Sequence, residues 1–131
     1  MVRKLKWEEV GVSNGPSFLS PGCVSSKNCD LLFTSGCVGN DPITGEYPED
    51  VESQARNAME NMKRVLESAS SNFDYVLKAL LFISDPSYAS AVNKVYQEFF
   101  PGRPSRSCIV VSFPDPKLKF EMECVAEVPA N

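Results

Sequence analysis

Apolar side chains recur every three or four residues in two stretches of the chain, which is the pattern of an amphipathic helix. The first stretch begins after Asp50, a residue suited to cap a helix. Its apolar positions are Val51, Ala55, Ala58, Met59, Met62, Val65, Leu66 and Ala69. The second follows Asp85-Pro86, where the proline suits the first helical turn, and stops at Pro101-Gly102. Its apolar positions are Tyr88, Ala91, Val92, Val95, Tyr96 and Phe99.

Shorter apolar runs at 30–36, 75–83, 108–113 and 117–126 predict strands. The run at 75–83 is almost continuously apolar, which is typical of a strand buried on both faces. The last two runs flank the turn residues 114–116, so we expect them to pair as a hairpin. Within the last run the side chains alternate, and one face carries Leu118, Phe120, Met122, Cys124 and Ala126.

These elements together predict an α+β fold, in which two helices cover one face of a mixed sheet. Residues 1–131 are expected to form a single domain, because the chain has the length of one domain and contains no low-complexity tract. The stretch 13–22, rich in glycine, proline and serine, is expected to be an irregular loop. The second face of the strand at 75–83 needs a cover, which partner subunits could supply.

Composition then limits the chemistry. The chain has no histidine, which excludes Ser-His-Asp and Cys-His nucleophile pairs, zinc sites built on histidine and proton relays through imidazole. Its five cysteines are odd in number and form no C-x-x-C pair, so neither a disulfide framework nor a structural zinc site is predicted. The net charge of −4 argues against binding to nucleic-acid phosphates as the main function.

Targeting signals are not predicted either. No apolar run approaches the roughly 18 residues of a membrane span, and residues 1–9 lack the apolar core of a secretory signal. A reducing, cytoplasmic compartment is the default expectation, and the sequence does not separate the cytosol from the mitochondrion.

Without histidine, arginine and glutamate on neighbouring strands become the candidates for chemistry. Arg106 can present a guanidinium fork to a carboxylate, and Glu121 can orient a water or pass a proton. The alternative is a surface arginine and a solvated glutamate in a weak ion pair. In the expected hairpin Glu121 lies opposite Val110, which leaves Arg106 about 13 Å farther along the strand. A long arginine and a small ligand could span that gap.

Three further residues have both a functional and a structural interpretation. Cys108 could be a thiolate beside Arg106, or a small strand residue whose backbone matters more than its sulfur. Asn93 could line a binding cleft or simply occupy its helix, whereas Tyr96 is interpreted as packing. Gly36 at a strand end could permit a close backbone approach or only form a turn.

Six short motifs in a fixed order resemble the RidA/YjgF family of enamine/imine deaminases. They are Phe33-Thr-Ser-Gly36, Thr44-Gly-Glu46, Gln54-Ala-Arg-Asn-Ala-Met-Glu-Asn61, Val92-Asn-Lys-Val-Tyr96, Pro104-Ser-Arg-Ser-Cys108 and Phe120-Glu-Met-Glu-Cys124. The resemblance extends from about Asp30 to Val128. It implies a chorismate-mutase-like fold, assembled as a homotrimer whose sheets form a central barrel and whose ligand clefts lie between subunits.

The resemblance also implies an activity. Members hydrolyse 2-imino or 2-enamino acids, such as 2-aminoacrylate and 2-iminobutyrate, to 2-keto acids and ammonia, and no metal or organic cofactor is implied. Arg106 matches the arginine that binds the substrate carboxylate, Cys108 a position whose backbone contacts the substrate, and Glu121 the glutamate thought to position the attacking water. Gly36 and Asn93 match positions that line the same cleft.

The N-terminal loop departs from the family pattern. Many members carry a tyrosine there, and the nearest match in this chain is Ser20. An alternative function is therefore a non-catalytic module, chaperone-like or binding a small carboxylate. A second alternative, endoribonuclease activity or inhibition of translation, is disfavoured by the absence of histidine and by the acidic pI.

Overall fold

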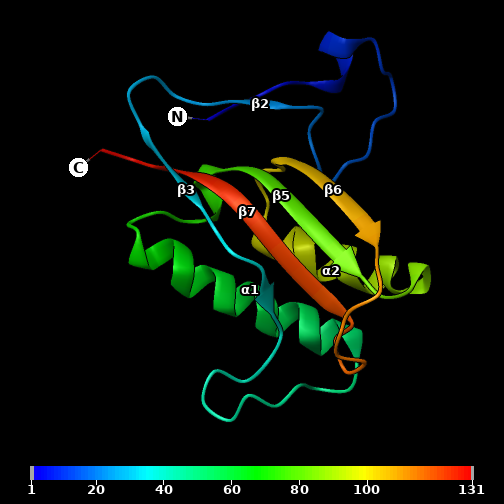
Figure 1. The fold of residues 1–131 in the computed structure, drawn as a ribbon. Helices are drawn as coiled ribbons and strands as arrows, with labels where there is room; N and C mark the ends of the chain where they lie inside the picture. The colour runs from blue at the N-terminus through cyan, green and yellow to red at the C-terminus, as the bar shows by residue number, and fades with distance from the viewer. Residues whose placement is uncertain (1, 131) are drawn as a thin grey trace.

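The computed structural model describes residues 2–130. Two α-helices and seven strands follow one another with three short 3-10 turns (Figure 1). In chain order they are β1 (Arg3–Lys4), η1 (Trp7–Val10), β2 (Cys23–Val24), β3 (Asp30–Phe33), β4 (Cys37–Val38), α1 (Val51–Ser68), η2 (Phe73–Tyr75), β5 (Val76–Ile83), η3 (Pro86–Tyr88), α2 (Ala89–Phe99), β6 (Ser105–Val110) and β7 (Phe120–Val128).

The main sheet has the strand order β3-β7-β5-β6, and the short β4 also pairs with β7. β5 and β6 are parallel, whereas β7 is antiparallel to β3, β4 and β5. Both α-helices lie on the same side of this sheet (Figure 1). The structure thus confirms an α+β fold with two helices on one face of a mixed sheet. A separate ribbon of β1 and β2, which the sequence did not predict, ties the N-terminal segment together.

Both helices begin where the sequence predicts. The Asp50 carboxylate accepts the backbone N–H of Ser53 at 2.9 Å and caps α1. Asp85 accepts the N–H of Ser87 at 2.8 Å and caps the turn η3, which leads directly into α2. The predicted stripes face the sheet, and their fully buried members are Ala55, Ala58, Met59, Met62, Leu66, Val92, Val95 and Tyr96.

The expected hairpin between the last two strands is wrong. β6 and β7 each pair with β5, which lies between them, so Glu121 is aligned with Phe82 and Val38 rather than with Val110. The reason is the crossover through α2, which returns the chain parallel to β5 and places β6 at the edge of the sheet. The loop at 111–119 then carries the chain past the end of β5 to its other side.

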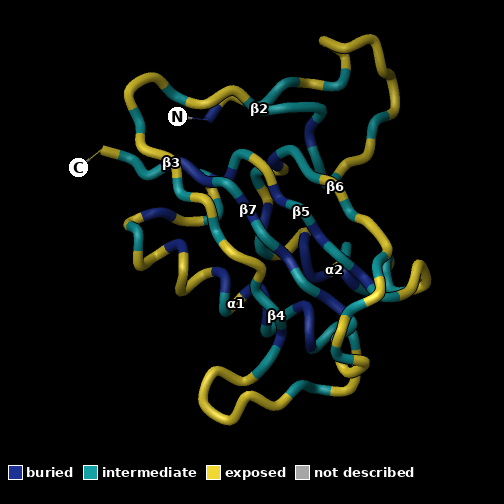
Figure 2. Tube along the Cα trace, viewed as in Figure 1, coloured by how far each residue is buried: buried dark blue, intermediate teal, exposed yellow. Residues whose placement is uncertain are grey.

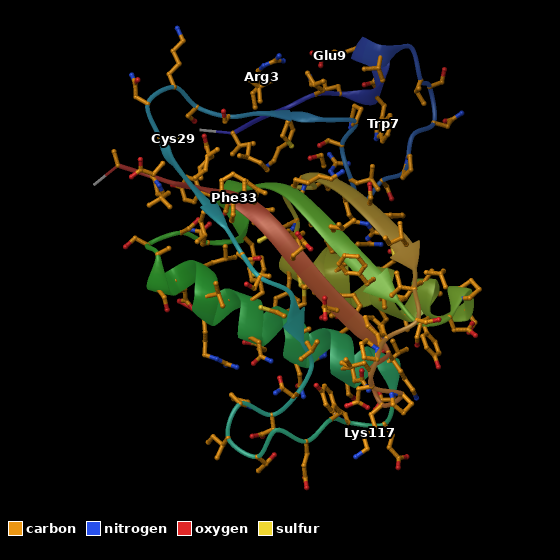
Figure 3. All side chains as sticks on the ribbon, viewed as in Figure 1. Arg3, Trp7, Glu9, Cys29, Phe33 and Lys117 are labelled. Carbon is orange, nitrogen blue, oxygen red and sulfur yellow. The ribbon has the colours of Figure 1, made fainter. Side chains whose placement is uncertain are left out.

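The strand at 75–83 is expected to be buried on both faces, with partner subunits covering the second, and this chain covers one of those faces. Ala79, Leu81 and Ile83 are buried under the helices, but Leu80 and Phe82 on the other face are only partly covered (Figure 2). That open face continues onto β3, where Phe33 is 71% exposed (Figure 3). One chain therefore covers one face of its sheet and leaves the other open, with apolar side chains such as Phe33 beside Glu121 and Glu123.

Candidate functional site

Arg106 lies on the edge strand β6 and is aligned with Ala79, so its side chain is directed to the helix-covered side of the sheet. There its Nη2 donates a hydrogen bond to the Asn93 Oδ1 of α2 at 2.7 Å. Asn93 thereby fixes one edge of the guanidinium plane. The structure brings together these two predicted site residues, although they come from different elements.

Two aromatic rings cover the Arg106 guanidinium. Its Cζ lies 4.6 Å from the centroid of the Tyr96 ring and 4.6 Å from that of the Phe18 ring. Tyr96 is fully buried and stacks on Phe100 with a centroid separation of 4.4 Å, so this side is rigid. Phe18 comes from the irregular N-terminal loop. Both rings favour the cation through its attraction to their π faces.

Two guanidinium nitrogens of Arg106 have no hydrogen-bond partner. Nε and Nη1 are both buried, and no acceptor among residues 2–130 reaches them. Burial lowers the pKa of Arg106, but a guanidinium stays protonated at any physiological pH. Because unpaired buried donors of a cation are costly, these two atoms indicate a site for an anionic acceptor that residues 2–130 do not supply.

Cys108 follows on the same strand and the same face. Its side chain packs against the core, and burial raises the pKa of its thiol, which disfavours the thiolate. The N–H of Val111 donates to the carbonyl of Ile83 at 2.9 Å, and a parallel ladder alternates its bonding residues. The backbone N–H and C=O of Cys108 are therefore directed to the outer edge of β6, away from β5.

Glu121 and Gly36 form a second group. A Cβ at Gly36 would lie only 2.5 Å from Oε2 of Glu121, so the carboxylate rests directly on the glycine backbone. No larger residue at position 36 allows that contact. Next to them, burial and the charge of Glu121 raise the pKa of the Cys37 thiol.

These two groups lie on opposite faces of the sheet. Arg106 is aligned with the buried Ala79, whereas Glu121 is aligned with Phe82, which alternates with the buried residues of β5. A single chain thus brings Arg106, Asn93 and Cys108 together, and separately Glu121 and Gly36. It does not bring Arg106 and Glu121 together.

Ser20 is buried at the base of the N-terminal loop. Its N–H donates to the carbonyl of Pro104 at 3.4 Å, and its hydroxyl to the carbonyl of Gly22 at 3.5 Å. Phe18, two residues earlier, is the loop residue that contacts Arg106. Sequence reasoning missed Phe18, whose only signal was an aromatic residue in a polar loop, and it assigned Tyr96 to packing alone.

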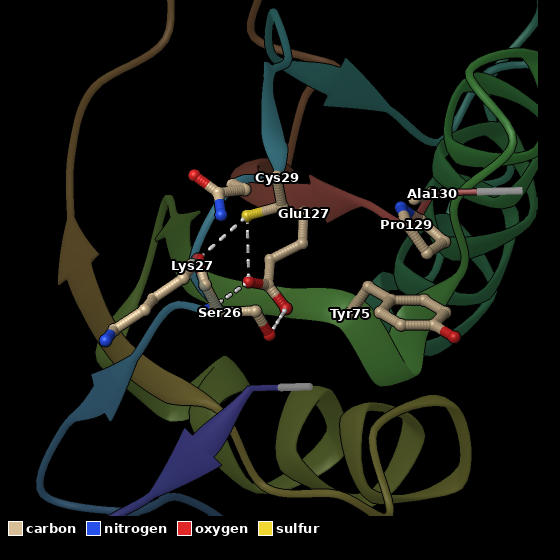
Figure 4. A pocket seen from close by; sticks show the side chains of 8 residues that line it. Ser26, Lys27, Cys29, Tyr75, Glu127, Pro129 and Ala130 are labelled. Carbon is tan, nitrogen blue, oxygen red and sulfur yellow. Dashed lines mark hydrogen bonds between the residues drawn. The ribbon is translucent and has the colours of Figure 1, made fainter.

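A separate pocket of about 230 Å³ lies where β7 ends (Figure 4). Its base is Glu127, only 2% exposed, whose carboxylate accepts the Cys29 thiol at 3.0 Å and both the backbone N–H and the hydroxyl of Ser26. Burial opposes ionisation of Glu127, but these donors outweigh it and lower the pKa of the carboxyl group. This cluster fastens the loop before β3 to the last strand.

Neither the group around Arg106 nor the group around Glu121 contains the donors of a metal site. Within residues 2–130, no three cysteine, aspartate or glutamate side chains gather closely enough to hold a metal ion. The same residues include no helix long and apolar enough to cross a bilayer.

Comparison with known proteins places this geometry in a family. Residues 23–128 match the family model described as Endoribonuclease L-PSP. A RutC family protein of Pasteurella multocida is 32% identical over 122 residues, which cover 89% of this chain and 95% of the relative. The 2-iminobutanoate/2-iminopropanoate deaminase of Escherichia coli is 31% identical over 121 residues, 89% of this chain and 94% of that enzyme. The chain belongs to the RidA/YjgF family.

A solved RidA/YjgF relative agrees with the fold. The crystal structure of Escherichia coli TdcF with bound serine is 33% identical to this chain and has a TM-score of 0.70. The match covers 88% of this chain and 90% of the TdcF chain. The resemblance inferred from six short motifs is therefore confirmed at the level of the family.

Proposed function

We propose that this RidA/YjgF protein hydrolyses small, reactive 2-imino and 2-enamino acids to 2-keto acids and ammonia. The observation that carries the proposal is Arg106, a buried guanidinium with two unpaired nitrogens, held at one edge by Asn93. A substrate carboxylate supplies the acceptors that these nitrogens lack. The activity named for the Escherichia coli relative, 2-iminobutanoate/2-iminopropanoate deaminase, supports the same class of substrate.

The reaction requires little from the protein beyond placement. The enamine tautomerises to the imine, water adds to the imine carbon, and the tetrahedral product loses ammonia to leave the 2-keto acid. Arg106 holds the carboxylate next to that carbon, and the outward N–H and C=O of Cys108 offer backbone contacts to the substrate. Orientation of this kind can lower a barrier by several kcal/mol, on the order of 7 or more in intramolecular precedents.

The proposed site needs more than one copy of the chain. Glu121, which we propose positions the attacking water beside Gly36, lies on the face of the sheet opposite to Arg106. A ligand that contacts both must therefore lie between two subunits. We propose a homotrimer with three such clefts, in a chorismate-mutase-like barrel whose inner wall is the open sheet face that includes Phe33.

Ser20 supports the N-terminal loop at the rim of the cleft. No metal or organic cofactor takes part, the partner is a small 2-imino or 2-keto acid, and neither a membrane nor a nucleic acid is bound. The proposed compartment is the cytoplasm.

The test is turnover of an imine made in the same cuvette. A threonine dehydratase generates 2-iminobutyrate, and formation of the keto acid and ammonia is followed with and without the protein. Arg106→Lys is expected to lower kcat/KM by roughly 10- to 100-fold, because an ammonium keeps the charge but loses the planar fork. Arg64→Lys on the exposed surface of α1 serves as the matched control and should be neutral.

Wild-type protein that is no faster than Arg106→Ala would refute the proposal. Binding of 2-oxobutanoate without turnover would instead indicate the non-catalytic carboxylate-binding module. RNA cleavage that persists in Arg106→Ala and copurifies with the oligomer would indicate the endoribonuclease.

A further inference from the structure

The N-terminal loop that carries Phe18 lies directly over the Arg106 guanidinium. The Phe18 and Tyr96 rings both lie against the guanidinium, each with its centroid 4.6 Å from Cζ. Asn93 accepts the hydrogen bond from Nη2, and the atoms Nε and Nη1 are both buried, so solvent does not reach them. A carboxylate therefore reaches these two nitrogens only if one of the covering groups moves.

Phe18 is the less firmly packed member of the pair. Tyr96 belongs to α2, is fully buried and stacks on Phe100, so its displacement would disrupt the core. Residues 11–22 contain no helix or strand, and half of them are exposed. Away from Trp7, the bonds of residues 12–20 to the segment 103–104 are long, at 3.3 Å from Arg103 to the Ser17 carbonyl and 3.4 Å from Ser20 to the Pro104 carbonyl. Segments held by so few contacts open locally at low cost.

Trp7 fastens this loop from the other side. Its indole N–H donates to the carbonyls of Pro16 and Leu19, each at 3.1 Å, and these residues flank Phe18 in the sequence. A Cβ at Gly15 would lie 2.1 Å from the indole ring, so the loop backbone rests flat on Trp7. Trp7 is not one of the rings that cover Arg106. Its effect on Arg106 must therefore pass through the loop.

We propose that residues 12–20 form a lid over Arg106, with Phe18 as its contact and Trp7 as the positioning residue that holds it closed. A small carboxylate binds Arg106 only in the open state, so the measured affinity is the intrinsic affinity reduced by the fraction of open lid. The identity of that ligand as a 2-keto or 2-imino acid rests on the proposed function. The lid itself does not.

The first experiment needs no ligand. Phenylglyoxal modifies accessible arginines, and mass spectrometry gives the rate at Arg106 relative to Arg3, whose side chain is 62% exposed in the same protein. Arg106 is expected to react far more slowly than Arg3 in wild type. Phe18→Ala should raise its rate roughly 2- to 30-fold, the range that corresponds to losing one cation–π contact. Trp7→Phe should raise it as well, and Val10→Ala at the other end of the same turn should not.

The Trp7→Phe variant is the decisive test of the lid. It removes two hydrogen bonds to the loop without removing a ring that covers Arg106. An unchanged rate at Arg106 in Trp7→Phe, or a wild-type rate equal to that of Arg3, overturns the lid. Circular dichroism confirms that each variant is folded before its rates are compared.

The second experiment measures binding of 2-oxobutanoate by calorimetry. A lid predicts that Phe18→Ala binds more tightly, by about the same factor as the increase in modification rate. Weaker binding despite faster modification would mean that Phe18 is a fixed wall of the site, and would overturn the lid. If no variant binds 2-oxobutanoate, the proposed function fails, while the phenylglyoxal rates still decide on the lid.

Discussion

Gly36 is important because it has no side chain. The Glu121 carboxylate occupies the space where a Cβ would be, 2.5 Å from Oε2. Gly36→Ala is therefore expected to displace the end of the Glu121 side chain, which is flexible and can move without disrupting the strand. If Glu121 positions the water, kcat should fall roughly 10-fold or more, because small misplacements at a reacting centre are costly. The coupled dehydratase assay measures the effect.

Gly22→Ala is the matched control, since a Cβ there meets only the Leu5 Cδ1 at an ordinary 3.4 Å. The midpoint of urea unfolding should change little in either variant. Normal kcat in Gly36→Ala would argue against a role for Glu121 in placing water.

The individual site residues differ in how far the sequence could predict them. The alternation of polar and apolar residues correctly separated Glu121 from the buried face of its strand, because that pattern is local. The contact between Arg106 and Asn93 depends on β6 and α2 lying side by side, which only the tertiary fold determines. Phe18 could not be predicted at all, since an irregular loop has no periodic signal that shows where a side chain is directed.

The elements show the same division between local and distant information. Helix positions follow from side-chain spacing and from the caps at Asp50 and Asp85, which are properties of a few consecutive residues. Strand pairing is different. The turn residues 114–116 suggest a hairpin, yet they belong to a longer loop that passes the end of β5. Turn residues indicate where the chain reverses direction. They do not indicate which strand the following segment pairs with.

Gln54 links α1 to that loop and to the one before the helix. Its buried side-chain amide donates to the carbonyls of Pro48 and Lys117, at 2.8 and 2.9 Å, and accepts the N–H of Lys119 at 2.9 Å. Gln54→Leu keeps a similar volume but leaves three backbone groups unpaired. We expect it to lower the free energy of unfolding by about 3 kcal/mol. Urea denaturation gives this value from the shift in midpoint.

Gln97→Leu on the exposed side of α2 is the control, and its midpoint should stay close to that of wild type. Equal stabilities of the Gln54 and Gln97 variants would show that water replaces the three lost hydrogen bonds.

The whole molecule presents a sheet face with exposed apolar side chains that one chain does not cover. Phe33→Glu at this face is expected to cost a monomer almost nothing, because the side chain is 71% exposed. In the proposed trimer the same change buries a charge between subunits, so the assembly should dissociate. Sedimentation velocity should show a trimer for wild type and a smaller species for Phe33→Glu, with deaminase activity lost in parallel.

Ile43→Glu introduces the same charge at a side chain that is 92% exposed on a distant loop, and should leave the assembly intact. A wild-type protein that sediments as a monomer while retaining full activity would contradict both the trimer and the clefts between subunits.

The position of β7 in the sequence also determines at what stage of synthesis this fold can form. β3, β4 and β5 all pair with β7, which is the last of the seven strands to be synthesised. A nascent chain that ends before residue 120 already contains both helices, but β3, β4 and β5 lack their common partner. Such a chain exposes unpaired strand edges and an apolar core on the ribosome. The sheet therefore forms after translation of nearly all of the domain, and incomplete chains are the species most in need of chaperones.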